Sequence, residues 1–218
     1  MPQVFHRSFN AISRVSILGF LFILAGIGFA YARFSRSDYV TGQDVVREQP
    51  VQFYHKHHVG GLGLDCRYCH SSVEKSAYAG IPATQVCMNC HSQIWTNSPE
   101  LKPVHESFKT NKPIAWNRVH NLADFVYFDH SAHVNKGVGC SSCHGRVDEM
   151  PLIRQAAPLS MEWCLECHRQ PEKFLRDKED VFKMDWKPAA NQLEHGKELL
   201  KKYGIRKTHL DDCSVCHR

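Results

Sequence analysis

All ten cysteines of this chain fall into five C-x-x-C pairs, and a histidine follows each pair at once. No cysteine is left over, so any fold of the chain must present the same short motif five times. The motifs, in chain order, are Cys66, Cys69 and His70; Cys87, Cys90 and His91; Cys140, Cys143 and His144; Cys164, Cys167 and His168; and Cys213, Cys216 and His217.

C-x-x-C-H is the motif that attaches c-type haem. The two thiols form thioethers with the porphyrin vinyl groups, the intervening residues let the backbone make one helical turn, and the next imidazole binds the iron. Structural zinc would need no histidine at this fixed place, and five pairs do not divide into four-ligand sites. Disulfides would leave the histidines unexplained. The sequence therefore predicts five covalently bound haem c groups.

The composition excludes two broad classes of protein. Hydrophobic residues make up 43% of the chain and charged residues 22%, which is not the composition of a disordered chain. The formal net charge of +5 can suggest nucleic-acid binding. However, each oxidised haem with its two propionates adds roughly one negative charge, so five haems bring the protein close to neutrality. We expect no nucleic-acid partner.

Residues 15–32 form an apolar stretch without a single charge. As a helix they would span roughly 27 Å, the short end of a membrane crossing. A cleaved signal peptide is the alternative, since Ala30 and Ala32 resemble its cleavage site, but its apolar region is usually only about 7–15 residues long. We expect an uncleaved anchor. Because c-type haem is attached outside the bacterial cytoplasmic membrane, the predicted location is that membrane, with the N-terminus inside and the haem domain on the periplasmic face.

The first four motifs belong to two copies of one repeat. Motif starts lie 21, 53, 24 and 49 residues apart, so short and long spacings alternate. A segment of the form F-x-H-x-x-H-V precedes each close pair, beginning at Phe53 and at Phe128. A haem held by one histidine has an open sixth position that a second imidazole can fill. The pattern predicts four distal iron ligands, namely His55, His58, His130 and His133.

Five haems need a fifth distal ligand, and we predict His120. It follows the apolar stretch of residues 15–32 and lies in an aromatic and apolar segment between Trp116 and Phe125 that suits a porphyrin edge. The other candidates are His6, His57, His105, His195, His209, Met150 and Met161.

The predicted organisation is a cytoplasmic N-terminus at 1–14, a transmembrane anchor at 15–32, a linker at 33–52 and a pentahaem domain at 53–218. The di-haem repeats occupy about 53–95 and 128–172, and the fifth motif occupies 213–217. The predicted fold class is a mostly irregular and α-helical multihaem cytochrome c, with short helices and little or no sheet. Residues 189–203 have the pattern of an amphipathic helix, and residues 92–117 are predicted to be a long connection.

The chain resembles the membrane-anchored pentahaem cytochrome c subunit of alternative complex III. The most specific stretch runs from Trp116 to the motif at Cys140, and the M-E-W-C-L-E-C-H-R-Q-P-E run around Cys164 and the closing C-S-V-C-H-R also match. Class III multihaem cytochromes share the H-x-x-H layout. The resemblance implies a role in a membrane quinol-oxidising respiratory complex. It implies, as partners, an iron–sulfur protein, quinol-site membrane subunits and a monohaem cytochrome c.

An iron with both axial positions filled passes electrons but cannot bind a substrate. We therefore expect an electron-transfer subunit without catalytic residues. One alternative is a stand-alone membrane quinol dehydrogenase, which would have a quinol site at the membrane interface. A multihaem reductase is a second alternative, but it needs an open iron, often with lysine in place of the proximal histidine, and all five motifs end in histidine. A haem-based sensor would need an output module, and no segment resembles one.

Overall fold

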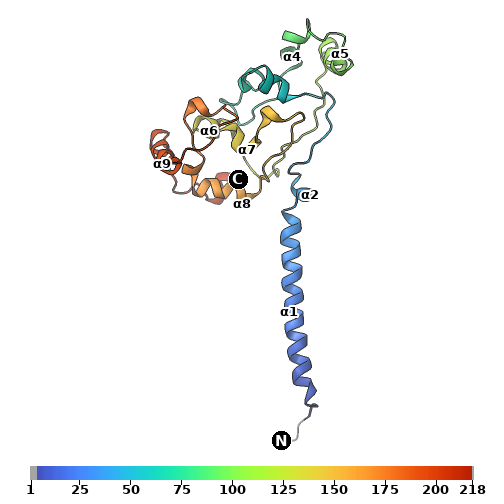
Figure 1. Cartoon of the computed structure of the whole chain (residues 1–218), viewed down its shortest axis with the longest axis vertical. Coiled ribbons are helices and arrows are strands. Elements are labelled where there is room, and N and C mark those ends of the chain that lie inside the picture. The colour runs from blue at the N-terminus through green and yellow to red at the C-terminus, as the bar shows by residue number, and fades with distance from the viewer. Residues whose placement is uncertain (1–3, 218) are drawn as a thin grey trace. The chain divides into compact units, whose positions relative to one another are not determined.

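The computed structural model describes residues 4–217 and divides into two units that meet between Gly42 and Gln43. The first unit consists of the long helix α1 (Ser8–Ser35) and the short helix α2 (Asp38–Thr41) (Figure 1). The second unit holds all five C-x-x-C-H motifs.

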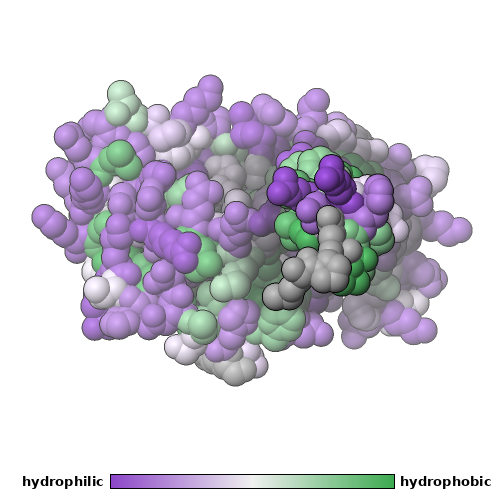
Figure 2. Space-filling view, turned by 90° about the horizontal axis from the view of Figure 1, so that it is seen from below, coloured by the Kyte–Doolittle hydropathy of each residue, from purple (hydrophilic) through white to green (hydrophobic). Residues whose placement is uncertain are grey.

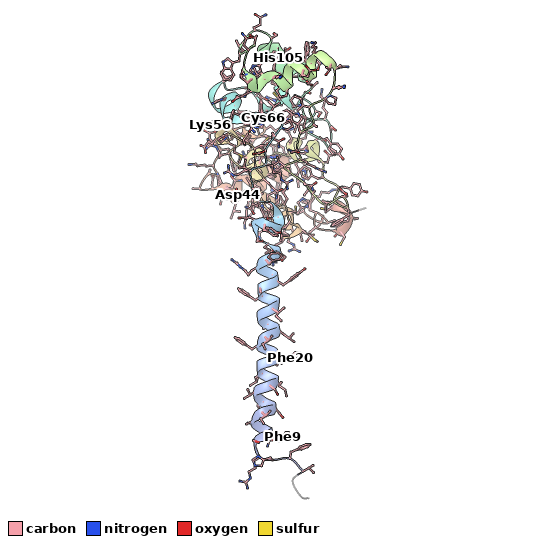
Figure 3. The ribbon with its side chains drawn as sticks, turned by 90° about the vertical axis from the view of Figure 1, so that its right-hand side faces the viewer. Phe9, Phe20, Asp44, Lys56, Cys66 and His105 are labelled. Atoms are coloured by element: carbon pink, nitrogen blue, oxygen red, sulfur yellow. The ribbon has the colours of Figure 1, made fainter. Side chains whose placement is uncertain are left out.

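Helix α1 is apolar around its whole circumference. None of its 28 residues is buried, and side chains such as Phe20 and Phe22 are 61% and 82% exposed. Figure 2 looks at its N-terminal end and shows apolar side chains around it, and Figure 3 shows Phe9 and Phe20 projecting away from its axis. Within residues 4–217 it is the one helix long and apolar enough to cross a membrane. At about 1.5 Å per residue it measures about 42 Å, and it extends beyond residues 15–32 at both ends.

The second unit is made of short helices joined by irregular chain. The residues that the structure describes contain no strand, only isolated bridges such as the one between Val138 and Leu175. This confirms the predicted fold class. The α-helices are α3 (Cys66–Cys69), α4 (Thr84–His91), α5 (Lys102–Thr110), α6 (His130–Asn135), α7 (Cys140–His144), α8 (Met161–Arg169), α9 (Gln192–Lys202) and α10 (Cys213–Cys216). One π-helix, η1 (Lys56–Gly61), and four 3₁₀ turns, η2 (Pro99–Leu101), η3 (Val147–Glu149), η4 (Pro171–Lys173) and η5 (Lys178–Asp180), complete the set.

The buried apolar side chains form three small clusters instead of one large core. The largest gathers Leu199, Leu200 and Tyr203 of α9 and its C-terminal end around Leu175. The other two are Val51, Leu101 and Val104, and Val73, Val134 and Val181. Clusters of three or four residues bury little area for a unit of this length. Attached porphyrins would supply the missing apolar surface between them.

The helix predicted at 189–203 is present as α9, which ends at Lys202, just before Gly204 in the left-handed region at φ +60°. The long connection predicted at 92–117 is not wholly irregular, because it contains η2 and α5. Pro99 and Pro103 lie in the first turns of these helices, where a missing N–H removes no helical hydrogen bond. Asn111, at φ +55°, then ends α5.

Candidate haem-attachment sites

Each C-x-x-C pair lies on one helical turn. The five turns are α3, α4, α7, α8 and α10, and in α3 and α10 the motif histidine donates its backbone N–H to the carbonyl of the first cysteine at 2.8 Å. Residues three apart share one face of a helix, so both thiols of a pair can reach one porphyrin edge. Asp65 caps α3 by accepting the Arg67 N–H, and Ser160 caps α8 by accepting that of Trp163.

The motif histidines are held through Nδ1. In four of the five, this nitrogen lies within hydrogen-bond distance of a backbone carbonyl. When Nδ1–H donates to a carbonyl, the ring orientation is fixed and Nε2 keeps its lone pair for a metal. The contacts are His70 to Gly80 O at 2.6 Å, His91 to Ile94 O at 3.3 Å, His168 to Leu210 O at 2.7 Å, and His217 to Phe125 O at 3.1 Å.

The two H-x-x-H segments have matching geometry. Phe53 stacks on His58 at 4.3 Å and meets His55 edge-on at 4.8 Å. Phe128 stacks on His133 at 4.5 Å and meets His130 edge-on at 4.8 Å. Three of these histidines also hold Nδ1 on a carbonyl, namely His58 on Tyr54 at 2.9 Å, His130 on Ala77 at 2.8 Å and His133 on Asp129 at 2.7 Å. Nδ1 of His55 is buried without a hydrogen-bond partner.

Three distal candidates lie at a ring separation from motif histidines that would admit one metal ion between them. With metal–nitrogen bonds of about 2 Å, two imidazoles on opposite sides of an iron have ring centroids about 6 Å apart. The observed separations are 6.2 Å for His58 and His91, 6.3 Å for His130 and His144, and 6.1 Å for His133 and His168. The rings of His130 and His144 are nearly parallel, at 10°. These residues therefore fit haem iron.

His55 lies in the same neighbourhood as the first motif. Burial, together with the nearby rings of His70, His58 and His120, lowers its pKa to about 4. Burial likewise lowers the pKa of His144 to about 3, with help from neighbouring histidines that include His120 and His130. A neutral imidazole is the form that binds a metal, so both environments favour ligation.

The structure brings His120 next to the third motif. Its Nε2 lies 3.2 Å from Nδ1 of His144, and the two ring centroids are 4.4 Å apart. His144 thus has an imidazole where the other motif histidines have a carbonyl. The ring of His217 packs against Phe125 at 5.6 Å. The role of His120 as the fifth distal ligand stays a prediction.

Three other candidates for the fifth distal ligand have no described contact with a motif histidine. His195 contacts the carboxylate of Asp177 at 2.8 Å, and exposed His209 contacts that of Asp212 at 2.9 Å. His105, on α5, has a buried Nε2 without a hydrogen-bond partner. Figure 3 shows it at the end of the second unit away from Asp44, with Cys66 between them.

Sequence reasoning missed Arg176, which is only 2% exposed. Its guanidinium donates to the hydroxyls of Ser141 and Ser142, the two residues between the cysteines of the third motif, at 3.2 and 2.9 Å. It also stacks on Trp186 at 4.1 Å. A single arginine in the charged run from Arg176 to Asp180 carries no signal that would have marked it.

Burial keeps several of the motif thiols neutral by raising their pKa. All ten cysteines are free in the structure. Burial raises the pKa of Cys143 to about 12 and that of Cys167 to about 11. Residues 4–217 contain no group of three or more His, Cys, Asp or Glu side chains placed to hold a bare metal ion.

Helical C-x-x-C-H turns that leave the imidazole Nε2 free for a metal are what covalently bound haem requires, and the chain belongs to the multihaem cytochrome c family. Residues 126–218 match the family described as cytochrome c7 and related cytochrome c. The chain is 30% identical over 187 residues to the multiheme cytochrome c subunit of menaquinone reductase from Nitratidesulfovibrio vulgaris (strain Hildenborough), covering 79% of this chain and 78% of that protein. Covalent haem c is the cofactor of this family, and electron transfer is its function.

Proposed function

We propose that this chain carries five haem c groups and relays electrons as a subunit of a membrane quinol-oxidising complex of the alternative complex III type. The observation that carries the relay is the set of three imidazole pairs with centroids 6.1–6.3 Å apart. Iron held between two imidazoles has no open position for a substrate. The chain is therefore an electron-transfer subunit and not the catalytic chain.

In this proposal the ten motif cysteines form the thioethers, and each motif histidine is the proximal ligand. His58 is the distal ligand at the second motif, His130 at the third and His133 at the fourth, as their ring separations indicate. By equivalence of the repeats, His55 serves the first motif. The haem, when bound, supplies a one-electron redox centre, and these side chains fix its position and complete its coordination.

The fifth distal ligand is proposed by count. Five proximal histidines and two H-x-x-H pairs leave one iron without a partner, and His120 is our candidate. The contact between His120 and His144 supports a second role, in which His144 donates its Nδ1–H to Nε2 of His120. Spectroscopy of a His120 variant separates these roles, as described in the Discussion.

We propose that α1 anchors the chain in the bacterial cytoplasmic membrane with residues 1–14 inside, 15–32 spanning and the linker 33–52 leading to a periplasmic domain at 53–218. The partners are then an iron–sulfur protein, quinol-site membrane subunits and a monohaem cytochrome c. The relative from N. vulgaris is a subunit of a menaquinone reductase, which supports a multisubunit quinone-linked complex. Its name also favours a second candidate function, in which the complex reduces a quinone instead of oxidising a quinol.

One preparation tests both functions. The complex would be purified from native membranes through a tag on this chain, and its subunits identified by mass spectrometry. Haem reduction by a short-chain quinol, followed by reduction of added cytochrome c, supports the quinol-oxidising reading. Haems that are reduced by a periplasmic electron donor and are then reoxidised only by a quinone support the quinone-reducing function. A chain purified from membranes without any partner would contradict both and favour the stand-alone quinol dehydrogenase.

A further inference from the structure

The five attachment motifs do not follow one another in space as they do in sequence. We infer that the spatial order of the first four is second, first, third, fourth, so that the first and third motifs form a junction between the repeats and the second motif lies beyond the first. This inference rests on the proposed function for the occupancy of all five motifs. Its consequence is that electrons pass between the two repeats through the first and third haems.

The junction of the first and third motifs is built by a reciprocal exchange between the repeats. The first H-x-x-H segment lies on the chain that follows the third motif, where Lys56 donates its N–H to Met150 O at 3.0 Å. A Cβ at Gly60 would collide with the carbonyl of Asp148, so the two backbones touch there.

The second H-x-x-H segment lies on the chain that follows the first motif. The backbone N–H of His130 donates to Ala77 O at 3.1 Å, and that of Ser131 donates to Ser76 O at 3.2 Å. The side chain of Asn135 also donates to Glu74 O at 2.8 Å. Each repeat therefore contacts the first haem motif of the other, and these two motifs lie face to face.

The thiols agree with this placement. The side chains of Cys66 and Cys140 are in hydrogen-bond contact with each other. The two sulfur atoms are neighbours although they lie in different repeats. The contact between His120 and His144, with His55 and His70 close by, belongs to the same junction.

Within each repeat, the H-x-x-H segment joins its two motifs. His130 faces His144 and His133 faces His168, so one short helix, α6, bridges the third and fourth motifs. In the first repeat His58 faces His91. Tyr68, inside the first motif, accepts a hydrogen bond from Asn89, inside the second, at 3.0 Å.

The fifth motif is attached to the fourth. His168 holds Nδ1 on Leu210 O at 2.7 Å, and Arg169 contacts the carboxylate of Asp211 at 3.3 Å. Both partners lie just before Cys213. Figure 1 shows α7 between the α4 and α5 pair at one end and α8 at the other, as expected for the second, third and fourth motifs.

The test follows photoinjected electrons through the full-length holoprotein. Exposed Thr208, near the fifth motif, and exposed Gln93, near the second, are each replaced by cysteine and coupled to a ruthenium photoreductant. His55→Met and His58→Met then mark the first and second haems by changing one axial ligand each. These two variants are matched controls, because they lie three residues apart on the same segment and make the same chemical change.

From the label at 208, the His55→Met marker should be reduced before the His58→Met marker, and from the label at 93 the order should reverse. The opposite result from the label at 208 would mean that the second motif, and not the first, adjoins the third, and it would overturn the inference.

A second pair of variants needs no methionine ligation. Removing the second haem with Cys87→Ala and Cys90→Ala should leave four haems that are reduced rapidly from position 208. Removing the first with Cys66→Ala and Cys69→Ala should leave only three, because the second haem is then cut off. Four rapidly reduced haems in the latter variant would overturn the order. Intact-mass measurement counts the haems beforehand, and a wild-type count below five contradicts the proposed function while the order is still measured on the haems attached.

Discussion

Replacing Arg176 with alanine should destabilise the second unit more than any exposed arginine does. The guanidinium is buried beneath the third motif, where it donates to the hydroxyls of Ser141 and Ser142 and to the carbonyls of Asp180 and Lys183 at 2.9–3.4 Å. A Cβ at Gly139 would overlap the guanidinium, so the motif backbone packs directly on it. Alanine would leave this space empty and the two carbonyls without their donor.

The magnitude follows from these contacts. Hydrogen bonds to charged groups are worth about 1.5–3 kcal/mol each, and burial of the charge offsets part of their sum, which leaves a net loss of about 3 kcal/mol. For a chain of this size each kcal/mol moves the melting temperature by about 2–4 °C, so the expected fall is about 6–12 °C. Arg146→Ala is the matched control, because its ion pairs with Asp148 and Glu149 are solvent-exposed and should contribute little to stability.

The assay is thermal unfolding of the detergent-purified holoprotein, followed by circular dichroism. Redox titration adds a second measurement, because loss of a buried positive charge should lower the reduction potential of the third haem. Arg176→Lys should restore much of that potential but only part of the stability, since an ammonium cannot reproduce the planar fork. Equal melting temperatures for Arg176→Ala and Arg146→Ala would refute the reasoning.

Three further outcomes are expected. Alkaline carbonate should leave the native chain in the membrane pellet, and exchange of residues 1–32 for a cleavable signal should release it; native chain in the wash would contradict the anchor. His120→Ala should keep five haems attached. A new high-spin haem in the EPR spectrum would identify His120 as a distal ligand. A low-spin spectrum with a shifted reduction potential would instead identify it as the hydrogen-bond partner of His144. The hydrogen bond from His195 lowers the pKa of Asp177, so this carboxylate stabilises the fold above its unfolded pKa of about 4 and loses that effect as the pH falls through its lower folded pKa. Wild type should therefore lose more melting temperature than Asp177→Asn between pH 6 and about pH 3, and equal losses would rule out the contribution.

The sequence predicted the fold class and the repeat because covalent attachment fixes spacing locally. A cysteine pair must lie on one turn, and an H-x-x-H segment must present two imidazoles, whatever surrounds them. The matching contacts of Phe53 and Phe128 show how closely the two copies agree. Helix α5 was missed because prolines in a first turn look the same in sequence as prolines that break a helix.

Contacts between residues far apart in the sequence leave no local pattern from which they could be predicted. His120 was chosen from its apolar neighbours, which could not reveal that its ring contacts His144, 24 residues away. Arg176 reaches the third motif across 35 residues, and its burial depends on Trp186 and on the approach of Gly139. The exchange between the repeats arises in the same way, through backbone carbonyls whose partners any residue type could supply.

The reciprocal contacts between the repeats also bear on the order of steps in biogenesis. On the proposed topology, translocation in chain order would deliver the first H-x-x-H segment before Met150, whose carbonyl accepts the Lys56 N–H. The second segment finds its acceptors, Ala77 and Ser76, already outside. We therefore expect maturation to be asymmetric, because the first H-x-x-H segment cannot complete its contacts until the second repeat has been translocated.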